Sequence, residues 1–390
     1  MVKLMIQIAL SKWWLPLIVD QICENSVSSL SLNMFDYELP EELIALRPLA
    51  ERGFGRLMVG DPQSGIVSSS VSELPQFLSE GDLLVFNNTQ VIPARLRGHK
   101  AGEGQFGAVE LLLLHPESDD GSFTSHTQWR AMGRPLKKLH PGQELNFNGL
   151  SAKVIKKVDG QHLTVGFSWS NDGWLADLVK HGVMPLPPYI EKKRPADDQD
   201  KQDYQPLLAK IPGAVASPTA SLHFDETLMK QLQQHGIQRA EVTLHVGAGT
   251  FLPVQSEQLE QHVMHKEWGV ISENTMQHIH ETKKQGGRVV AVGTTVMRIL
   301  ETVFRQNPCP KSYQGYTDIF LKPGSSFYVC DGLVTNFHLP RSTLLMLVSA
   351  FSGSEFMRAL YQRAIEEKYR FFSYGDASLL FRDRSMPWGR

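Results

Sequence analysis

The sequence predicts an α/β domain with a mostly parallel sheet, into which a small antiparallel β-barrel is inserted. Beyond residue 171, strand-like and helix-like segments alternate, which is typical of a parallel sheet covered by helices. Before residue 168, apolar strand-like runs follow one another with little helical periodicity. Two turns, Asn148-Gly149 and Asp159-Gly160, separate three of these runs and have the dipeptides that tight hairpins favour.

Length and composition restrict the class of protein. The 390 residues are enough for two or three domains with a large core. Hydrophobic residues make up 42% and charged residues 21%, which excludes a mainly disordered or fibrous chain. The 39 Lys and Arg against 41 Asp and Glu give a net charge of -2, so a uniformly basic nucleic-acid coat is excluded, although a local basic patch remains compatible with this charge.

The cysteines and the apolar runs indicate where the protein works. Cys23, Cys309 and Cys330 are widely spaced and form no CxxC pair, so we expect neither a disulfide framework nor a cysteine-rich zinc site. This favours a reducing, cytoplasmic location. No run reaches the ~18 apolar residues of a membrane-spanning helix, so we expect no membrane partner.

The beginning of the chain predicts an extension followed by a domain. Residues 1–33 are expected to lie outside the fold, because a polar, Ser-rich stretch precedes Met34, where a domain-like sequence begins. Pro40 and the two glutamates after it predict a helix start, and Pro48 disfavours its continuation. We expect residues 34–62 and 169–390 to form the α/β domain and residues 63–168 to form the barrel.

The remaining elements follow in order. A helix is expected over 173–181 because Gly182 follows it, and the three prolines in 184–190 require an extended segment. The highly charged residues 191–205 predict a mobile loop. The other expected helices lie near 225–235, over 273–285, from 295 and after 340, and the other strands over 240–246, 288–292 and 328–336.

Two glycine-rich turns end strands of the α/β part. His245 ends the first strand, and Gly247 and Gly249 would let a ligand approach the backbone. Gly293 joins the second strand to a helix whose first N–H groups could bind an anion. Ligands of open α/β sheets collect at such strand ends. Both segments are equally compatible with plain tight turns, and neither completes a dinucleotide fingerprint or a P-loop.

Histidines and one polar segment add further candidates. His262 and His265 are three residues apart, but zinc usually needs three or four ligands and this spacing differs from that of a zincin helix. We therefore expect no metal. Asn336 and His338 precede a proline-started apolar helix and face a ligand in one interpretation, or satisfy buried backbone groups in the other.

Basic residues of the barrel region are candidates for RNA phosphate contacts. We single out Arg95, Arg97, Lys137 and Lys138. Residues 63–160 contain equal numbers of basic and acidic side chains, so an ordinary mixed surface is the alternative.

Several long motifs are specific in combination. They run from FDYELPEELIA (35–45) to SYGD (373–376) and include the stretches GDLLVFNNTQVIPARL (81–96), GAVASPTA (213–220), TLHVGAGTF (243–251), AVGTTVMR (291–298), GYTDIFLKPG (315–324) and TNFHLPRSTLLMLVSAF (335–351). On these motifs the chain resembles the S-adenosylmethionine:tRNA ribosyltransferase-isomerase family of queuosine biosynthesis.

The resemblance implies a ribosyl transfer. Such enzymes move and isomerise the ribosyl part of S-adenosylmethionine onto 7-aminomethyl-7-deazaguanine at the tRNA wobble position, giving epoxyqueuosine and releasing adenine and methionine. S-adenosylmethionine is then a co-substrate, tRNA is the partner, and no prosthetic group is expected. The sulfonium acidifies the ribose 5′-carbon, so the reaction needs a general base. We expect the protein to be a monomer.

The resemblance also suggests residue roles. His245 is expected to be the acid/base, with an unperturbed pKa of about 6.5, and His338 the substrate orienter or second acid. Asp318 is expected to bind ribose hydroxyls or the amine, and residues 293–295 the methionine carboxylate. The residues expected to contact S-adenosylmethionine are Gly247, Gly249, Thr250, Gly293, Thr294, Thr295, Arg298 and Asn336.

The chain departs from the family pattern at four places, where it has Gly55, Gln90, Pro206 and Ser221. Ser221 replaces a glycine and Gln90 replaces an arginine. Two other functions therefore stay open: a methyltransferase with Gly247 and Gly249 in a cofactor loop, and a catalytically degenerate tRNA-binding protein. The methyltransferase would release S-adenosylhomocysteine, and the tRNA-binding protein would release no product.

Overall fold

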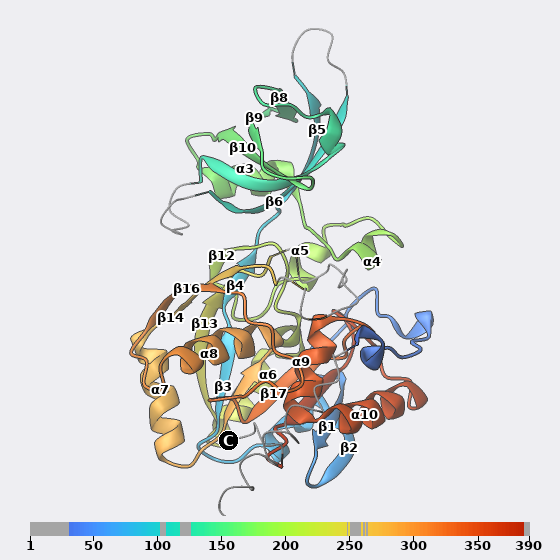
Figure 1. Cartoon of the computed structure of the whole chain (residues 1–390), viewed down its shortest axis with the longest axis vertical. Helices are drawn as coiled ribbons and strands as arrows, with labels where there is room; N and C mark the ends of the chain where they lie inside the picture. Colours follow the sequence, from blue (N-terminus) through green and yellow to red (C-terminus); the bar gives the residue numbers. More distant parts are fainter. Residues whose placement is uncertain are drawn as a thin grey trace, which may run out of the picture.

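Two β-sheets divide the protein into a larger and a smaller unit (Figure 1). The computed structural model describes residues 31–101, 107–117, 126–247, 249, 259, 262 and 264–385. The smaller unit stands above the carboxyl edge of the larger sheet, and the chain passes between the two units through a narrow connection (Figure 1). The α/β domain with an added antiparallel barrel is thus confirmed.

The larger unit contains a nine-stranded mixed sheet. Its strands, in spatial order, are β16 (Tyr313–Thr317), β14 (Glu267–Ile271), β13 (Gln238–Leu244), β3 (Leu83–Asn87), β15 (Val289–Val292), β17 (Gly332–Asn336), β18 (Ala377–Phe381), β1 (Arg56–Asp61) and β2 (Gly65–Ser70). The four central strands β13, β3, β15 and β17 are parallel. Antiparallel pairs lie toward both edges of the sheet.

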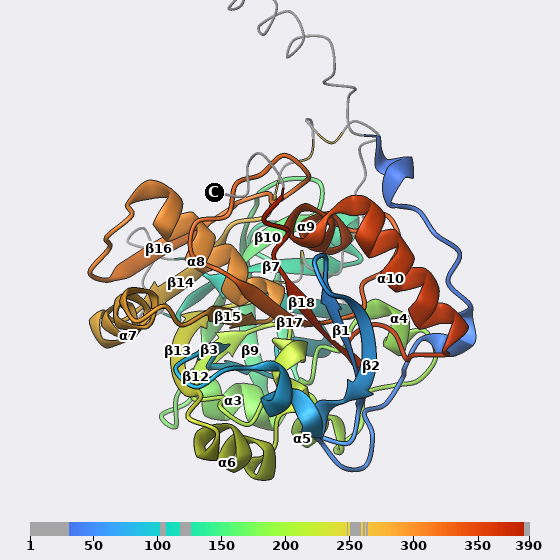
Figure 2. The same cartoon turned by 90° about the horizontal axis from the view of Figure 1, so that it is seen from below.

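Helices cover both faces of this sheet because its central strands are apolar on both sides. Leu83 and Val85 of β3 pack against one helical layer, whereas Leu84 and Phe86 pack against the other. Such a doubly buried strand is typical of parallel sheets. The first layer comprises α7 (Glu273–Lys284), α8 (Thr294–Gln306), α9 (Thr343–Ser352) and α10 (Ser354–Glu366), and the second comprises η3 (Val71–Phe77) and α6 (Glu226–Gln234) (Figure 2).

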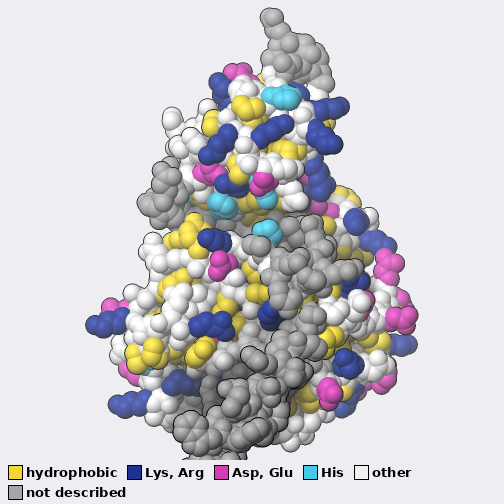
Figure 3. Space-filling model, in the orientation of Figure 1, with side chains coloured by type: hydrophobic (Ala, Val, Ile, Leu, Met, Phe, Trp, Pro, Cys, Tyr) yellow, Lys and Arg dark blue, Asp and Glu magenta, His cyan; other side chains and the backbone are white. Residues whose placement is uncertain are grey.

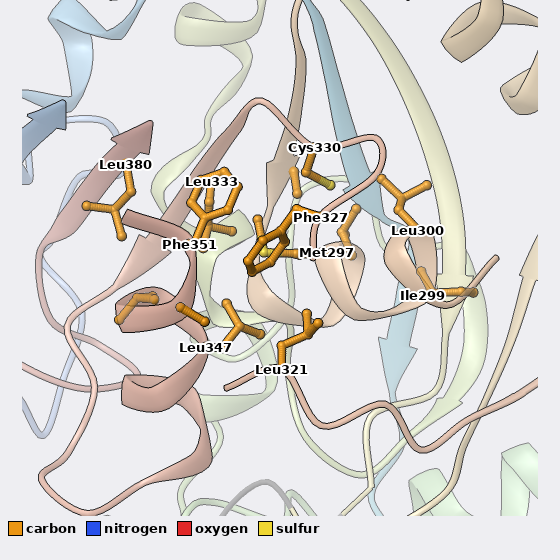
Figure 4. Close-up of a cluster of buried hydrophobic side chains, with 14 of the residues drawn as sticks. Met297, Ile299, Leu300, Leu321, Phe327, Cys330, Leu333, Leu347, Phe351 and Leu380 are labelled. Atoms are coloured by element: carbon orange, nitrogen blue, oxygen red, sulfur yellow. The ribbon is translucent and has the colours of Figure 1, made fainter. Parts of the chain in front are cut away.

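The largest core cluster lies between α8, α9 and the sheet. Met297 and Leu300 of α8 face Leu347 and Phe351 of α9, with Phe327 between them (Figure 4). All five side chains are at most 2% exposed, and full burial of each contributes about 1.5–3 kcal/mol. This packing fixes the start of α8, where the second glycine-rich turn lies.

The smaller unit is a closed barrel. Its strands, in spatial order, are β5 (Arg95–Lys100), β6 (Ala108–Pro116), β7 (Gln128–Arg134), β10 (His162–Ser168), β9 (Leu150–Lys157) and β8 (Glu144–Phe147), and β8 pairs again with β5. β11 (Gly182–Val183) adds to β5. The three-strand meander expected around the two Gly turns is confirmed as β8, β9 and β10.

The barrel begins later in the chain than we expected. β2 and β3 belong to the nine-stranded sheet, so the expected start at residue 63 is corrected to the beginning of β5. The barrel also continues beyond residue 168, since Leu178 of α3 (Trp174–His181) lies in the barrel core. A parallel pair of short strands, β4 (Thr89–Val91) and β12 (Ile211–Ala214), forms the connection between the units.

Two segments differ from the sequence expectation. η1 (Leu32–Phe35) packs Leu32 into the main core with 3% exposure, so residues 31–33 belong to the fold, while residues 1–30 lie outside the described residues. The helix expected after Pro40 is only the short turn η2 (Glu41–Leu43), because Ile44 pairs with Phe371 instead.

The charged segment 191–205 is ordered by ion pairs and is not a mobile loop. It follows α4 (Pro188–Glu191) and contains α5 (Asp200–Asp203). The buried carboxylate of Asp200 accepts hydrogen bonds from Arg194 at 2.7 Å and from Arg47 at 3.1 Å. Two guanidinium groups therefore fix a segment whose composition alone indicated mobility. Among the described residues, no helix is long and apolar enough to cross a bilayer.

We predict that Leu32→Ala lowers the free energy of unfolding by about 2–4 kcal/mol, because it leaves a cavity in the core. Chemical denaturation followed by circular dichroism measures the change. Leu49→Ala is the matched control, since Leu49 is 41% exposed, and its effect should stay within about 0.5 kcal/mol. If the Leu32 variant and the wild type were equally stable, residues 31–33 would be a dispensable extension that does not contribute to the core.

Candidate active site at the carboxyl edge of the parallel strands

Four sequence motifs meet at one edge of the nine-stranded sheet. Asn87 ends β3, His245 follows β13, Gly293 follows β15, and Asn336 ends β17. Because these strands are parallel, their carboxyl ends lie on the same side. β3 continues through β4 into the barrel, so this edge faces the barrel (Figure 1). The expectation that His245, Gly293 and Asn336 lie at a shared edge is confirmed.

The backbone beside His245 is fixed by Asn87. The Asn87 side-chain amide donates to the carbonyl of Leu244 at 2.8 Å, and its oxygen accepts from the Leu244 N–H at 3.0 Å. The same oxygen accepts from the Thr89 N–H at 3.2 Å. One buried amide thus joins the end of β13 to the start of β4 and sets the position of the next residue, His245.

The imidazole of His245 is held by three neighbours. Its Nδ1 lies 2.8 Å from Thr89 Oγ1, and its ring stacks on Trp268 at an interplanar angle of 11°. Gly213 lies against the ring, and a Cβ at this position would come within 2.6 Å of it. Any side chain at residue 213 would therefore displace the imidazole.

Thr89 Oγ1 links the ring of His245 to the backbone of β12. It lies 2.8 Å from Nδ1 of His245 and 3.4 Å from the carbonyl oxygen of Ile211. Burial lowers the pKa of His245 to about 4. The ring is neutral near pH 7, in contrast to the unperturbed value expected from the sequence.

His245 lines a cavity of 210 Å³ between the two units, which we call the seam cavity. Gly247 and Gly249 line it from the sheet side, as expected. His115 and Arg130 line it from the barrel. Histidine side chains also gather at this seam on the surface (Figure 3). The cavity therefore combines a neutral base from one unit with cationic and aromatic groups from the other.

A buried ion pair supports the loop after His245. Glu267 pairs with Arg298 of α8, and the other oxygen of Glu267 accepts from the Gly247 N–H at 3.1 Å. Arg298 is 5% exposed, and its Nη2 has no hydrogen-bond partner among the described residues. Arg298 is absent from the described lining of this cavity and of the next one, and its ion pair supports the loop that carries Gly247. Its expected contact with S-adenosylmethionine stays a prediction.

A second cavity of 60 Å³ lies at the Gly293 turn. Gly293 has φ 100°, which favours glycine, and begins α8. The first N–H groups of a helix have no partners within that helix. Thr295 Oγ1 is buried without a hydrogen-bond partner in the described part of the chain. Thr294 and Asn336 also line it, so four expected ligand contacts share one small cavity next to a helix start.

Asn336 is the centre of a buried hydrogen-bond network. Its oxygen accepts from Thr219 Oγ1 at 3.1 Å, and its amide lies 3.1 Å from Nε2 of His223. Burial, together with the nearby guanidinium groups of Arg370 and Arg52, lowers the pKa of His223 to about 4. The neutral His223 ring can accept the Asn336 N–H and thereby orient the Asn336 amide.

His338 also lines the small cavity but has several structural partners. The ring Nε2 of His338 lies 3.1 Å from Thr335 Oγ1. The backbone N–H of His338 donates to the Tyr361 hydroxyl at 2.9 Å. Its carbonyl accepts from the Tyr37 hydroxyl. Burial lowers the pKa of His338 to about 3. The ring is therefore neutral near pH 7, like that of His245.

Other expected site residues lie elsewhere. Asp318 follows β16 at the same edge but is exposed and lines neither cavity. Thr250 lies outside the described residues. Arg95 is buried and paired with Glu110 and Glu191, so it is not available to an RNA phosphate.

The remaining basic candidates are exposed on the barrel. Arg97 lies on β5, and Lys137 and Lys138 lie on η4 (Leu136–Lys138). Lys and Arg side chains gather on this unit (Figure 3). In the described ranges, no group of three or more His, Cys, Asp or Glu side chains could hold a metal ion.

Several residues that shape the site have no visible role in the sequence. Asn87 and Thr89 lie within the quoted motif 81–96, but their type gives no sign of a contact with His245. Trp268 and Glu267 lie on the antiparallel strand β14, more than 20 residues away from His245. His223 lies in no quoted motif, and its contact with Asn336 joins residues 113 positions apart.

Comparisons with known proteins show the family of this chain. A family described as "Queuosine biosynthesis protein" matches residues 32–380. The chain belongs to this family. Curated relatives named S-adenosylmethionine:tRNA ribosyltransferase-isomerase include those from Ruegeria sp. (strain TM1040), 49% identical over 90% of this chain and 99% of that protein, and from Ruegeria pomeroyi, 50% identical over the same shares. A crystal structure of S-adenosylmethionine tRNA ribosyltransferase from Thermotoga maritima matches with TM-score 0.51 and 34% identity, over 89% of this chain and all of that one.

Two departures from the family pattern border the Asn336 network. Ser221 is buried, and its hydroxyl has no hydrogen-bond partner among the described residues. At Gly55 a Cβ would lie 3.7 Å from Asp376 and 3.8 Å from His223, which is ordinary contact. A serine hydroxyl therefore fits at residue 55, and its absence here removes a polar neighbour of His223.

We predict that the protein loses stability as the pH falls below about 6.5. His223, His245 and His338 have lowered pKa values when folded, so the unfolded chain binds more protons between about pH 4 and 6.5, and the free energy of unfolding falls with pH. Each group contributes a slope of up to about 1.4 kcal/mol per pH unit.

Urea unfolding at several pH values between 4.5 and 7.5 measures this slope. His338→Asn should reduce it by about a third, whereas His235→Asn, which changes an exposed histidine, should leave it unchanged. A pH-independent free energy of unfolding over this range would contradict the neutral buried state of the three rings.

Proposed function

We propose that this chain transfers and isomerises the ribosyl moiety of S-adenosylmethionine onto 7-aminomethyl-7-deazaguanine at the wobble position of tRNA. Adenine and methionine leave, and epoxyqueuosine-tRNA forms. The proposal rests on one observation above all: the His245 imidazole, held by Thr89, lines a cavity between the sheet edge and the barrel. The names of the family's curated members supply the substrates.

His245 is the proposed base. The sulfonium of S-adenosylmethionine acidifies the ribose 5′-carbon, and the lone pair of Nε2 can remove a proton there. The imidazolium that forms is a stronger acid than an unperturbed one, because burial lowers its pKa, so it readily passes the proton to the leaving adenine. Thr89 and Trp268 keep the ring orientation through both steps.

The small cavity at the Gly293 turn is the proposed site of the methionine end. Its helix start favours a carboxylate, because unpaired N–H groups and the helix dipole both attract negative charge. Thr295 offers a buried hydroxyl without a partner, and Asn336 offers an amide oriented by His223. His338 orients the wall of this cavity, and Asp318 is left outside the proposed machinery.

The barrel is the proposed tRNA-binding unit. The target base enters the seam cavity, while exposed Arg97, Lys137 and Lys138 contact phosphates. Arg95 holds the barrel against α4 instead. The cysteine pattern supports a cytoplasmic location. A monomer suffices for this function, because the proposed site and the proposed tRNA-binding unit belong to the same chain.

A methyltransferase is the alternative that shares S-adenosylmethionine. It needs a cofactor loop at Gly247 and Gly249, but here the Gly247 N–H is bonded to Glu267. A catalytically degenerate tRNA-binding protein is the other alternative. Product analysis separates all three, because only ribosyl transfer releases adenine and methionine together.

We predict that His245→Ala slows adenine and methionine release by at least ~100-fold, the contribution of one general base. The assay supplies S-adenosylmethionine and tRNA that carries the aminomethyl-deazaguanine, and the wild type should release both products in equal amounts. His235→Ala is the control. Release of S-adenosylhomocysteine would reject the reaction, and a fully active His245→Ala, verified as folded, would reject the base assignment.

We predict that Lys137→Ala and Lys138→Ala each weaken tRNA binding and reduce the salt slope of log Kd by about one. Each lost phosphate contact releases one fewer counterion. Filter binding at several salt concentrations measures both quantities. Lys230→Ala on α6, in the larger unit, should leave them unchanged, and unaltered slopes in the two barrel variants would place the tRNA elsewhere.

A further inference from the structure

A larger cavity of 370 Å³ lies beside the seam cavity, and we call it the flanking cavity. The two share Met132 of β7 as a wall. Val215, which lines the flanking cavity, donates its N–H to the carbonyl of Val246 at 2.9 Å, and Val246 directly follows His245. The flanking cavity is therefore next to the proposed catalytic centre, on both its barrel side and its sheet side.

The lining of the flanking cavity combines an apolar interior with a charged edge. Leu112 and Met132 come from the barrel, and Pro185 and Leu186 come from the segment before α4. The cationic side chains at its edge are Arg97, Arg134 and Lys192, which are exposed. Flat apolar walls accept a nucleobase, and a cationic edge accepts the phosphates that flank it.

Two carboxylates lie inside the same cavity and add polar specificity. Glu110 and Glu191 both pair with the buried Arg95, at 2.7 Å and 3.0 Å. The second oxygen of Glu110 accepts from Arg97 at 3.0 Å. Glu191 pairs with Arg95 through one oxygen, so its other oxygen can accept a hydrogen bond from the amino or imino edge of a base. Since Glu110 belongs to β6 and Glu191 to α4, Arg95 also holds the two walls at a fixed separation.

We infer that the flanking cavity binds an unpaired nucleotide adjacent to the modified one in the same RNA loop. Sequence-selective proteins commonly take up RNA loop bases that are splayed from the stack and held on apolar or aromatic surfaces. Their shared wall residue, Met132, places this subsite directly beside the seam cavity. The inference rests on the proposed function for the identity of the loop, but its test does not require turnover.

The experiment measures the Kd of a stem-loop RNA bearing the modified base by fluorescence anisotropy. Two further RNAs carry an abasic nucleotide on the 5′ or the 3′ side of that base. The wild type should bind one of them about tenfold more weakly, because the abasic nucleotide lacks the base whose apolar surface the cavity would bury. Leu112→Trp fills the cavity from the barrel, so it should weaken binding of the intact RNA to a similar extent and bind intact and abasic RNAs equally.

Two further variants keep the test decisive. Pro188→Trp fills the cavity from the opposite wall and should reproduce the effect if Leu112→Trp fails to fold. Ile155→Trp introduces the same side chain on β9, at a 40% exposed position away from the cavity, and should bind all three RNAs like the wild type.

Equal affinity of the wild type for the intact RNA and both abasic RNAs would overturn the inference. So would filling variants that still discriminate against the abasic RNA. Adenine release from the same samples tests the proposed function separately. If the wild type releases no adenine but still binds the abasic RNA more weakly than the intact RNA, the reaction is rejected and the nucleotide subsite is kept.

Discussion

The candidate site depends on the buried side chain of Asn87. Its amide and its oxygen both bond to the backbone of Leu244, so β3 and β13 end in a fixed register. Asn87 therefore places His245, which follows β13, and Thr89, which begins β4, at hydrogen-bond distance from each other. Aspartate could not replace it, because a carboxylate accepts but does not donate when ionised, and a buried carbonyl would lose its partner at a cost of about 1–3 kcal/mol.

Desolvation then determines the chemistry of the histidines at this edge. His245, His223 and His338 all lie in places where burial disfavours a charged ring and lowers its pKa. Neutral rings can accept protons and hydrogen bonds but cannot donate two at once. The site is thus suited to removing a proton from an already cationic substrate, which supplies the positive charge itself.

Much of this arrangement could be predicted from the sequence, because it follows local patterns. The strand ends at His245, Gly293 and Asn336 were visible as apolar runs that stop at glycines or polar residues, and parallel topology brings such ends together. The hairpin dipeptides around residues 148 and 159 likewise predicted the barrel meander. The positions of residues at strand ends could therefore be predicted from the sequence.

Contacts between distant strands were not accessible in the same way. Trp268 and Glu267 act through antiparallel pairing of β14, whose direction no local pattern specifies. Arg95 looked like an RNA contact because its charge is visible in the sequence, whereas its burial against Glu191 depends on how two units meet. The barrel boundary was misplaced for a related reason, since β2 and β3 have strand-like sequences that fit either sheet.

The order of strands has a consequence for how the chain reaches its native state. β1 lies beside β18, so Leu57 pairs with Ala377, more than 300 residues later, whereas the barrel pairs only strands between residues 95 and 183. Contacts of such long sequence separation form slowly and late. During synthesis the barrel can close while the nine-stranded sheet still lacks its last strands. The edge of β1 that pairs with β18 stays open until the end of the chain has been made. The sheet edge that carries His245 and Asn336 can therefore be completed after the barrel has closed.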